Sequence, residues 1–135
     1  MNLSYKQALW ASYTILDTIY DEMAYHKLRF ILSDMSPFTF EDRICADPAL
    51  WEMWLKCSNK TNPAGSLTYD QVMTTLVDFL KVNEADYSCF KEEGGDYSTD
   101  EVVVFVSNYV SNGYWEKTLN EVVGHTETFS NEYES

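Results

Sequence analysis

Apolar residues in the first third of the chain recur at the period of one helical face. The stripe consists of Leu9, Tyr13, Leu16, Tyr20, Met23 and Phe30, and neither Pro nor Gly interrupts the chain before Pro37. Ser4-Tyr5-Lys6-Gln7 has the spacing of a capping box, which marks a helix start. The pattern predicts one long helix over about residues 5–34. Ile15, Ile19, Trp10 and Leu28 widen its apolar stripe, so we expect a central helix packed against more than one neighbour.

Two more helices are predicted in the middle of the chain. Asp47-Pro48 is a strong helix start. The Asp side chain accepts hydrogen bonds from the free amides of the first turn, and Pro has no amide hydrogen to leave unpaired there. We expect that helix to run over 48–58, after an irregular segment in which Thr39 opens a single helical turn. Thr68-Tyr69-Asp70-Gln71 is a second capping box, followed by an apolar face over 69–83. Asn62-Pro63-Ala64-Gly65 lies between the two helices and has the composition of a turn.

The last third contains conflicting signals. Ser98-Thr99-Asp100-Glu101 is a third capping box, but Val102-Val103-Val104-Phe105-Val106 favours a strand by its β-branching. The apolar residues keep one helical face as far as Val110 and do not alternate, which favours a helix. A short last helix is expected over 114–123, stopped by Gly124. Periodicity is absent from 84–96, which we interpret as an acidic connecting loop.

These elements predict an all-α fold: a single-domain bundle of about five helices around a long N-terminal central helix. The alternative is an α+β fold, if 102–106 is a strand. We expect residues 1–124 to form the helical domain and residues 125–135 to form a flexible acidic tail. The chain has 135 residues, 45% of them hydrophobic and 16% aromatic, which is enough apolar material for one packed core.

The charge balance narrows the classes of partner. Nine Lys and Arg residues stand against 22 Asp and Glu residues, which gives a formal net charge of −13. Phosphate backbones and anionic lipids repel such a surface, so we expect no direct nucleic-acid binding and no membrane binding. The same field attracts a basic protein. The three cysteines have no CxxC spacing and the N-terminus has no leader-like pattern, which predicts reduced thiols and a cytoplasmic protein.

Candidate catalytic and metal-binding patterns are weak. Glu22 and His26 share a helical edge, but a di-metal bundle needs Glu-x-x-His pairs from two helices. The segment 60–71 has the second half of a calcium loop, whereas Lys60 and Ala64 stand where calcium needs oxygen ligands. We therefore expect no metal, no cofactor, no catalytic residue and no enzyme activity.

The function that the sequence favours is protein binding. We expect a small acidic inhibitor or immunity-type protein that neutralises a basic partner, such as a nuclease toxin. Its charge would steer the partner toward it, and a few anchor side chains would then be buried in the interface. The predicted partner-binding residues concentrate negative charge and tyrosines around the acidic loop: Glu84, Asp86, Tyr87, Glu92, Glu93, Asp96, Tyr97, Asp100 and Glu101. Two alternatives remain. One is a DNA mimic, with carboxylates along an elongated surface. The other is a helical enzyme, with Glu22 and His26 facing into a pocket between the first helix and the Trp-bearing helix.

Overall fold

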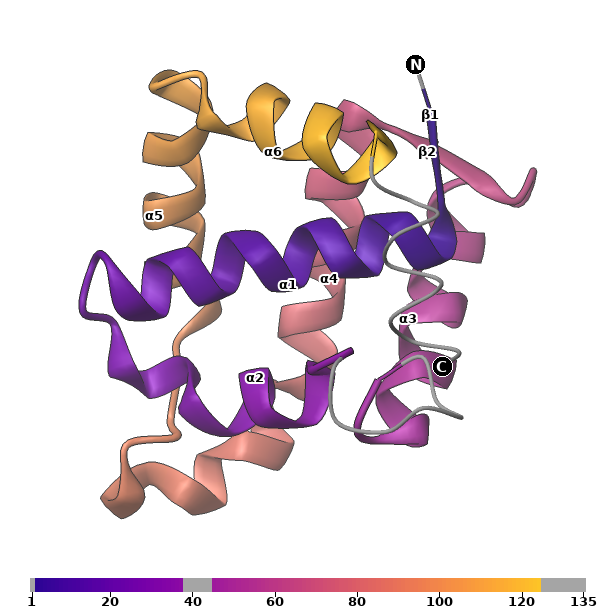
Figure 1. Ribbon diagram of the computed structural model, residues 1–135. Helices are drawn as coiled ribbons and strands as arrows, with labels where there is room; N and C mark the ends of the chain where they lie inside the picture. Colours follow the sequence, from indigo (N-terminus) through magenta and orange to yellow (C-terminus); the bar gives the residue numbers. More distant parts are fainter. Residues whose placement is uncertain (1, 38–44, 125–135) are drawn as a thin grey trace.

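A computed structural model describes residues 2–37 and 45–124 of the chain (Figure 1). The expected helical turn near Thr39 and the expected tail over 125–135 lie outside these residues. The α-helices are α1 (Tyr5–Asp21), α2 (Arg29–Met35), α3 (Pro48–Thr61), α4 (Tyr69–Tyr87), α5 (Thr99–Ser111) and α6 (Tyr114–Gly124). Two 3-10 helices, η1 (His26–Leu28) and η2 (Ser88–Glu93), and two short strands, β1 (Asn2–Ser4) and β2 (Ser66–Thr68), complete the described elements. The predicted all-α class is confirmed.

Helix α1 occupies the centre of the molecule (Figure 1). It contacts α2, α3, α4, α5 and α6, and its buried residues include Leu9, Trp10, Ala11 and Ile19. These residues spread around much of the helix, as a helix with several neighbours requires. The prediction of a central N-terminal helix is therefore confirmed.

The predicted length of that helix is wrong. Helix α1 ends at Asp21, and Ala24 takes a left-handed conformation with φ of 56°. The chain then reverses, and α2 packs against α1 as a separate helix. Tyr25 at the reversal is buried, and its hydroxyl accepts a hydrogen bond from the amide of Ser98 at 3.0 Å. The sequence lacks Pro and Gly here, so tertiary packing rather than local propensity breaks the helix.

A two-stranded antiparallel sheet was not predicted. β1 pairs with β2, and Leu3 lies opposite Leu67 with both side chains fully buried. Each strand leads directly into a helix through a capping box, one opened by Ser4 and the other by Thr68. The turn between α3 and β2 is shorter than the gap between the two predicted helices, because α3 continues to Thr61 and β2 begins at Ser66.

The segment expected to be an acidic loop is largely helical. Helix α4 continues to Tyr87 and η2 covers 88–93, so the expectation of a loop over 84–96 is wrong for most of that range. Residues 102–106 belong to α5, so the predicted helix is confirmed and the alternative of a strand is not. The third capping box does not form: Ser98 precedes α5 but makes no side-chain capping bond.

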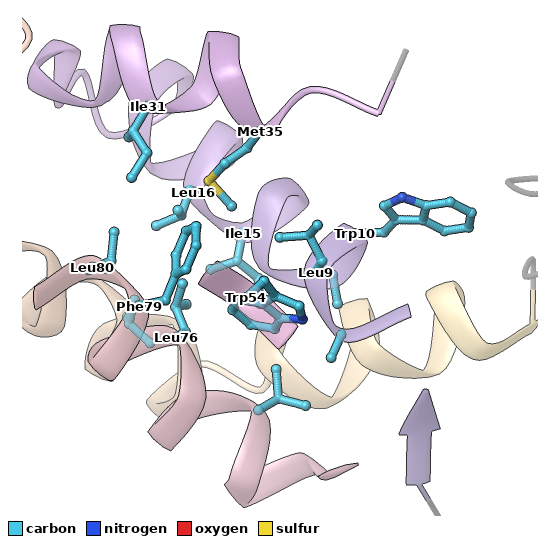
Figure 2. Packing of buried hydrophobic residues seen from close by; sticks show 14 of the residues in the cluster. Leu9, Trp10, Ile15, Leu16, Ile31, Met35, Trp54, Leu76, Phe79 and Leu80 are labelled. Atoms are coloured by element: carbon cyan, nitrogen blue, oxygen red, sulfur yellow. The ribbon is translucent and has the colours of Figure 1, made fainter. Parts of the chain in front are cut away.

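The part of the core drawn in Figure 2 lies where α1, α2, α3 and α4 meet, and buried residues of α5 and α6 extend the same cluster. Figure 2 shows Trp54 of α3 beside α1 and Phe79 of α4, and the two rings meet edge to face at 5.3 Å between centroids. The Trp54 indole donates to the backbone oxygen of Tyr5 at 2.7 Å. This bond satisfies a polar atom that burial would otherwise penalise. None of the described helices combines the length and the apolar character needed to cross a bilayer.

Candidate functional site: an acidic hollow

Two backbone hydrogen bonds bring distant carboxylates together between α2 and α3. The amide of Ala46 donates to the oxygen of Ser36 at 2.9 Å, and the amide of Asp47 donates to the oxygen of Asp34 at 3.0 Å. Asp34 lies in the last turn of α2, whereas Asp47 is the N-cap of α3. These bonds fix the end of one helix against the start of the next.

Asp86, near the C-terminal end of α4, joins the two aspartates around a cavity of about 260 Å³. We call this cavity the acidic hollow. Its walls also contain apolar side chains from α3 and from η2. The described lining residues are Asp34, Asp47, Ala49, Leu50, Met53, Asn83, Asp86, Tyr87 and Phe90.

The three carboxylates of the acidic hollow have no cationic partner among the residues that the structure describes. The described ion pairs are Lys27 with Glu101 and Lys60 with Asp78. Asp34 instead accepts from the Tyr87 hydroxyl at 2.7 Å, and Asp47 accepts from the amide of Ala49 at 2.9 Å. Over residues 2–37 and 45–124, no group of three or more His, Cys, Asp or Glu side chains is placed to hold a metal ion.

The field of these carboxylates acts on neighbouring groups that are shielded from water. Burial raises the pKa of Tyr87 far above its usual range, and the hydrogen bond to Asp34 and the charges of Asp34 and Asp47 add to the shift. Burial likewise raises the pKa of Cys45 to about 11, with Asp47 and Asp34 contributing. The hollow therefore disfavours a second anion and favours a cation.

Two of the nine predicted partner-binding residues are core residues. Tyr87 is 5% exposed and Tyr97 is 1% exposed. The Tyr97 hydroxyl donates to the backbone oxygen of Leu80 at 2.7 Å, and the Tyr87 hydroxyl is bound to Asp34. Both side chains therefore pack inside the domain and leave little surface for a partner.

Glu84 and Glu101 make contacts within the domain. One oxygen of Glu84 accepts from the amide of Thr99 at 3.3 Å and from its hydroxyl at 2.6 Å, so Glu84 caps α5 in place of Ser98. Glu101 lies 3.9 Å from the ammonium of Lys27.

The other predicted acids differ in their placement. Asp86 lines the acidic hollow, whereas Glu92, Glu93 and Asp100 are exposed on η2 and α5 and Asp96 is half-buried. Of the nine predicted residues, only Asp86 and Tyr87 line the hollow.

Sequence reasoning missed Asp34 and Asp47 as site residues. Asp47 was identified as a helix cap, and Asp34 was placed within a single long helix. Their proximity to Asp86 depends on contacts across more than thirty residues, which no local pattern encodes. No local signal marks the reversal after Asp21 that turns α2 back against α1, because the sequence has neither Pro nor Gly there.

The cavity expected between the first helix and the Trp-bearing helix, with Glu22 and His26 inside, is not found among the described residues. Glu22 lines a different hollow, of about 440 Å³, between α1, α5 and α6. His26 is exposed outside it, with its ring 5.2 Å from that of Tyr20. The two side chains therefore do not share one cavity. Cys45 and Cys57 are buried free thiols, and Cys89 is an exposed one.

Comparison of this chain with protein-family models, with curated proteins and with solved structures found no match.

Proposed function

We propose that this chain is a small acidic protein-binding domain of the inhibitor or immunity type, which neutralises a basic protein such as a nuclease toxin. The observation that carries the proposal is the acidic hollow: Asp34, Asp47 and Asp86 converge from three helices without a described cation beside them. Its apolar walls suit the aliphatic stem of a Lys or Arg side chain, and its carboxylates suit the charged end.

The net charge of −13 supports the same function at longer range. A negative field raises the encounter rate with a positively charged surface, and the partial desolvation of the hollow strengthens the final contact. A DNA mimic would need its carboxylates along an elongated surface. The convergence of three aspartates on one hollow favours a patch that receives basic side chains, so we prefer the inhibitor.

The proposal is tested by comparing two triple variants that remove equal charge. The hollow variant carries Asp34→Asn, Asp47→Asn and Asp86→Asn. Asn keeps the helix-capping oxygen at position 47 and an acceptor for Tyr87 at position 34. The control carries Asp21→Asn, Asp70→Asn and Glu116→Gln, three exposed sites on α1, α4 and α6.

The unchanged protein and both variants are immobilised and exposed to a lysate of the source cells at low and at high salt. We expect the unchanged protein to retain a basic protein that high salt releases. With that partner purified, the hollow variant should bind at least about tenfold more weakly than the control variant. Equal affinities of the two variants, or retention of no basic protein, would refute the proposal.

A further inference from the structure

A second hollow, separate from the acidic one, lies between α1 and α2 and has a volume of about 300 Å³. We call it the α1–α2 hollow. It exists because the chain reverses after Asp21 and lays α2 against α1. Helix α1 contributes Tyr13, Asp17 and Tyr20, which lie on one face of the helix, and α2 and its C-cap contribute the opposite side. The lining is Tyr13, Asp17, Tyr20, Arg29, Leu32, Ser33 and Ser36.

The α1–α2 hollow contains one negative and one positive side chain that do not pair with each other. Asp17 comes from α1 and Arg29 from α2, and no ion pair within 4.0 Å joins them. The Arg29 guanidinium instead lies 5.4 Å from the ring centroid of Phe30. Both charged side chains are exposed and so accessible to a ligand.

Polar and apolar groups between these charges define the rest of the hollow. At one end Tyr13 lies within hydrogen-bonding reach of Ser36, and Tyr20 packs against the ring of His26. Leu32 supplies an apolar wall, and the exposed Ser33 hydroxyl is available to a ligand. A ligand with one charge would leave the opposite side chain without a partner. A ligand with an ammonium group and a carboxylate meets both.

We propose that the α1–α2 hollow binds a small zwitterion, a free α-amino acid, whose ammonium group pairs with Asp17 and whose carboxylate pairs with Arg29. The guanidinium fork matches a carboxylate in a bidentate arrangement, which a lysine could not offer. The volume lies at the small end of the range for ligand pockets, roughly 300–1,000 Å³. Such a volume suits an amino acid better than a nucleotide.

The electrostatic state of Asp17 is consistent with a cation-binding role. Although the side chain is exposed, the protein shields part of it from water, and this partial burial and then the charge of Asp21 raise the pKa of the Asp17 carboxyl. An ammonium group beside Asp17 would offset both effects, because an opposite charge favours the ionised carboxylate.

The test is a titration of the uniformly ¹⁵N-labelled protein, followed by amide chemical shifts, with each standard amino acid at about 10 mM, enough to detect a millimolar Kd. We expect at least one amino acid to move amides of both 13–20 and 29–36 in a saturable way. Its N-acetyl and its amide derivatives, which each lack one charge, should bind at least about tenfold more weakly.

Four single variants then separate the site from general charge effects. Asp17→Asn and Arg29→Gln should each weaken binding at least about tenfold. The controls, Asp100→Asn and Lys56→Gln, change the same charges at exposed positions on α5 and α3 that do not line the hollow, and they should bind as the unchanged protein does. The inference is overturned if no amino acid saturates these shifts, if the blocked derivatives bind equally well, or if the controls weaken binding as much.

This inference does not rest on the proposed function. The triple variant of the acidic hollow leaves every residue of the α1–α2 hollow in place, so it should bind the amino acid normally. Loss of partner binding and loss of amino-acid binding are therefore separate outcomes.

Discussion

At the scale of single residues, the hydroxyl of Tyr87 links the core to the acidic hollow. It donates to Asp34 at 2.7 Å from a side chain that is 5% exposed. We expect Tyr87→Phe to lower the free energy of unfolding by about 2 kcal/mol, because a buried hydrogen bond to a charged group is lost. Urea denaturation at neutral pH measures the change.

Tyr114→Phe is the matched control for that substitution, because Tyr114 is 52% exposed and no hydrogen bond of its hydroxyl is found among the described residues. Its effect should stay below about 0.5 kcal/mol. Equal effects of the two substitutions would show that the Tyr87 hydroxyl has no structural role.

The cysteines should differ in reactivity by their burial. Cys89 is exposed, whereas Cys45 and Cys57 are buried, and burial raises the pKa of both buried thiols. Since the thiolate is the reactive form, a thiol reagent at mildly alkaline pH should modify one cysteine in the folded protein and three after denaturation. Peptide mapping should identify Cys89 as the residue modified first. Early modification of Cys45 would contradict the burial of its side chain.

The raised pKa of Cys45 also predicts how stability depends on pH. The folded state holds this proton to about pH 11, whereas the ordinary thiol loses it near 9.0. The unfolded state therefore binds fewer protons between these values, so the stability contributed by the neutral thiol is present below pH 9 and is lost as pH rises toward 11. Over this pH range, denaturation experiments should show that the free energy of unfolding of Cys45→Ala falls less steeply than that of the unchanged protein.

At the scale of elements, the start of α5 shows how a tertiary contact replaces a local one. The sequence predicts that Ser98 caps this helix, but Glu84 of α4 accepts from the amide and hydroxyl of Thr99 instead. We expect Glu84→Ala to cost about 1 to 2 kcal/mol and Ser98→Ala only a few tenths. Ser4→Ala and Thr68→Ala, which remove capping bonds that do form, should each cost about 1 kcal/mol.

Thermal or urea unfolding of these four variants ranks them by their loss of stability. Circular dichroism checks that each variant keeps its native helicity. A larger loss from Ser98→Ala than from Glu84→Ala would reverse the assignment of the cap.

Local signals predicted the helix starts well, because a cap and its partner lie three residues apart. The capping boxes at Ser4 and Thr68 and the Asp47-Pro48 start are all present. The reversal after Asp21 was not predictable in this way, since it depends on burying Tyr25 and on its bond to Ser98, more than seventy residues later. The three-residue strands are too short to show a period, and Asp34, Asp47 and Asp86 meet only once that reversal has formed.

At the scale of the whole molecule, the excess of negative charge should oppose folding and favour binding at the same time. The net charge is −13, and the described residues form only two ion pairs, so added salt screens more repulsion than attraction. We expect the Tm to rise between low and moderate NaCl concentrations by about 4 °C, equivalent to about 1 kcal/mol.

Salt should act on partner binding in the opposite direction, because binding depends on attraction between unlike charges. A Tm that rises with salt while partner affinity falls would show that salt releases the partner from a folded and more stable protein. A Tm that falls with salt would mean that attractive pairs dominate this surface, and loss of the partner could then reflect unfolding rather than screening.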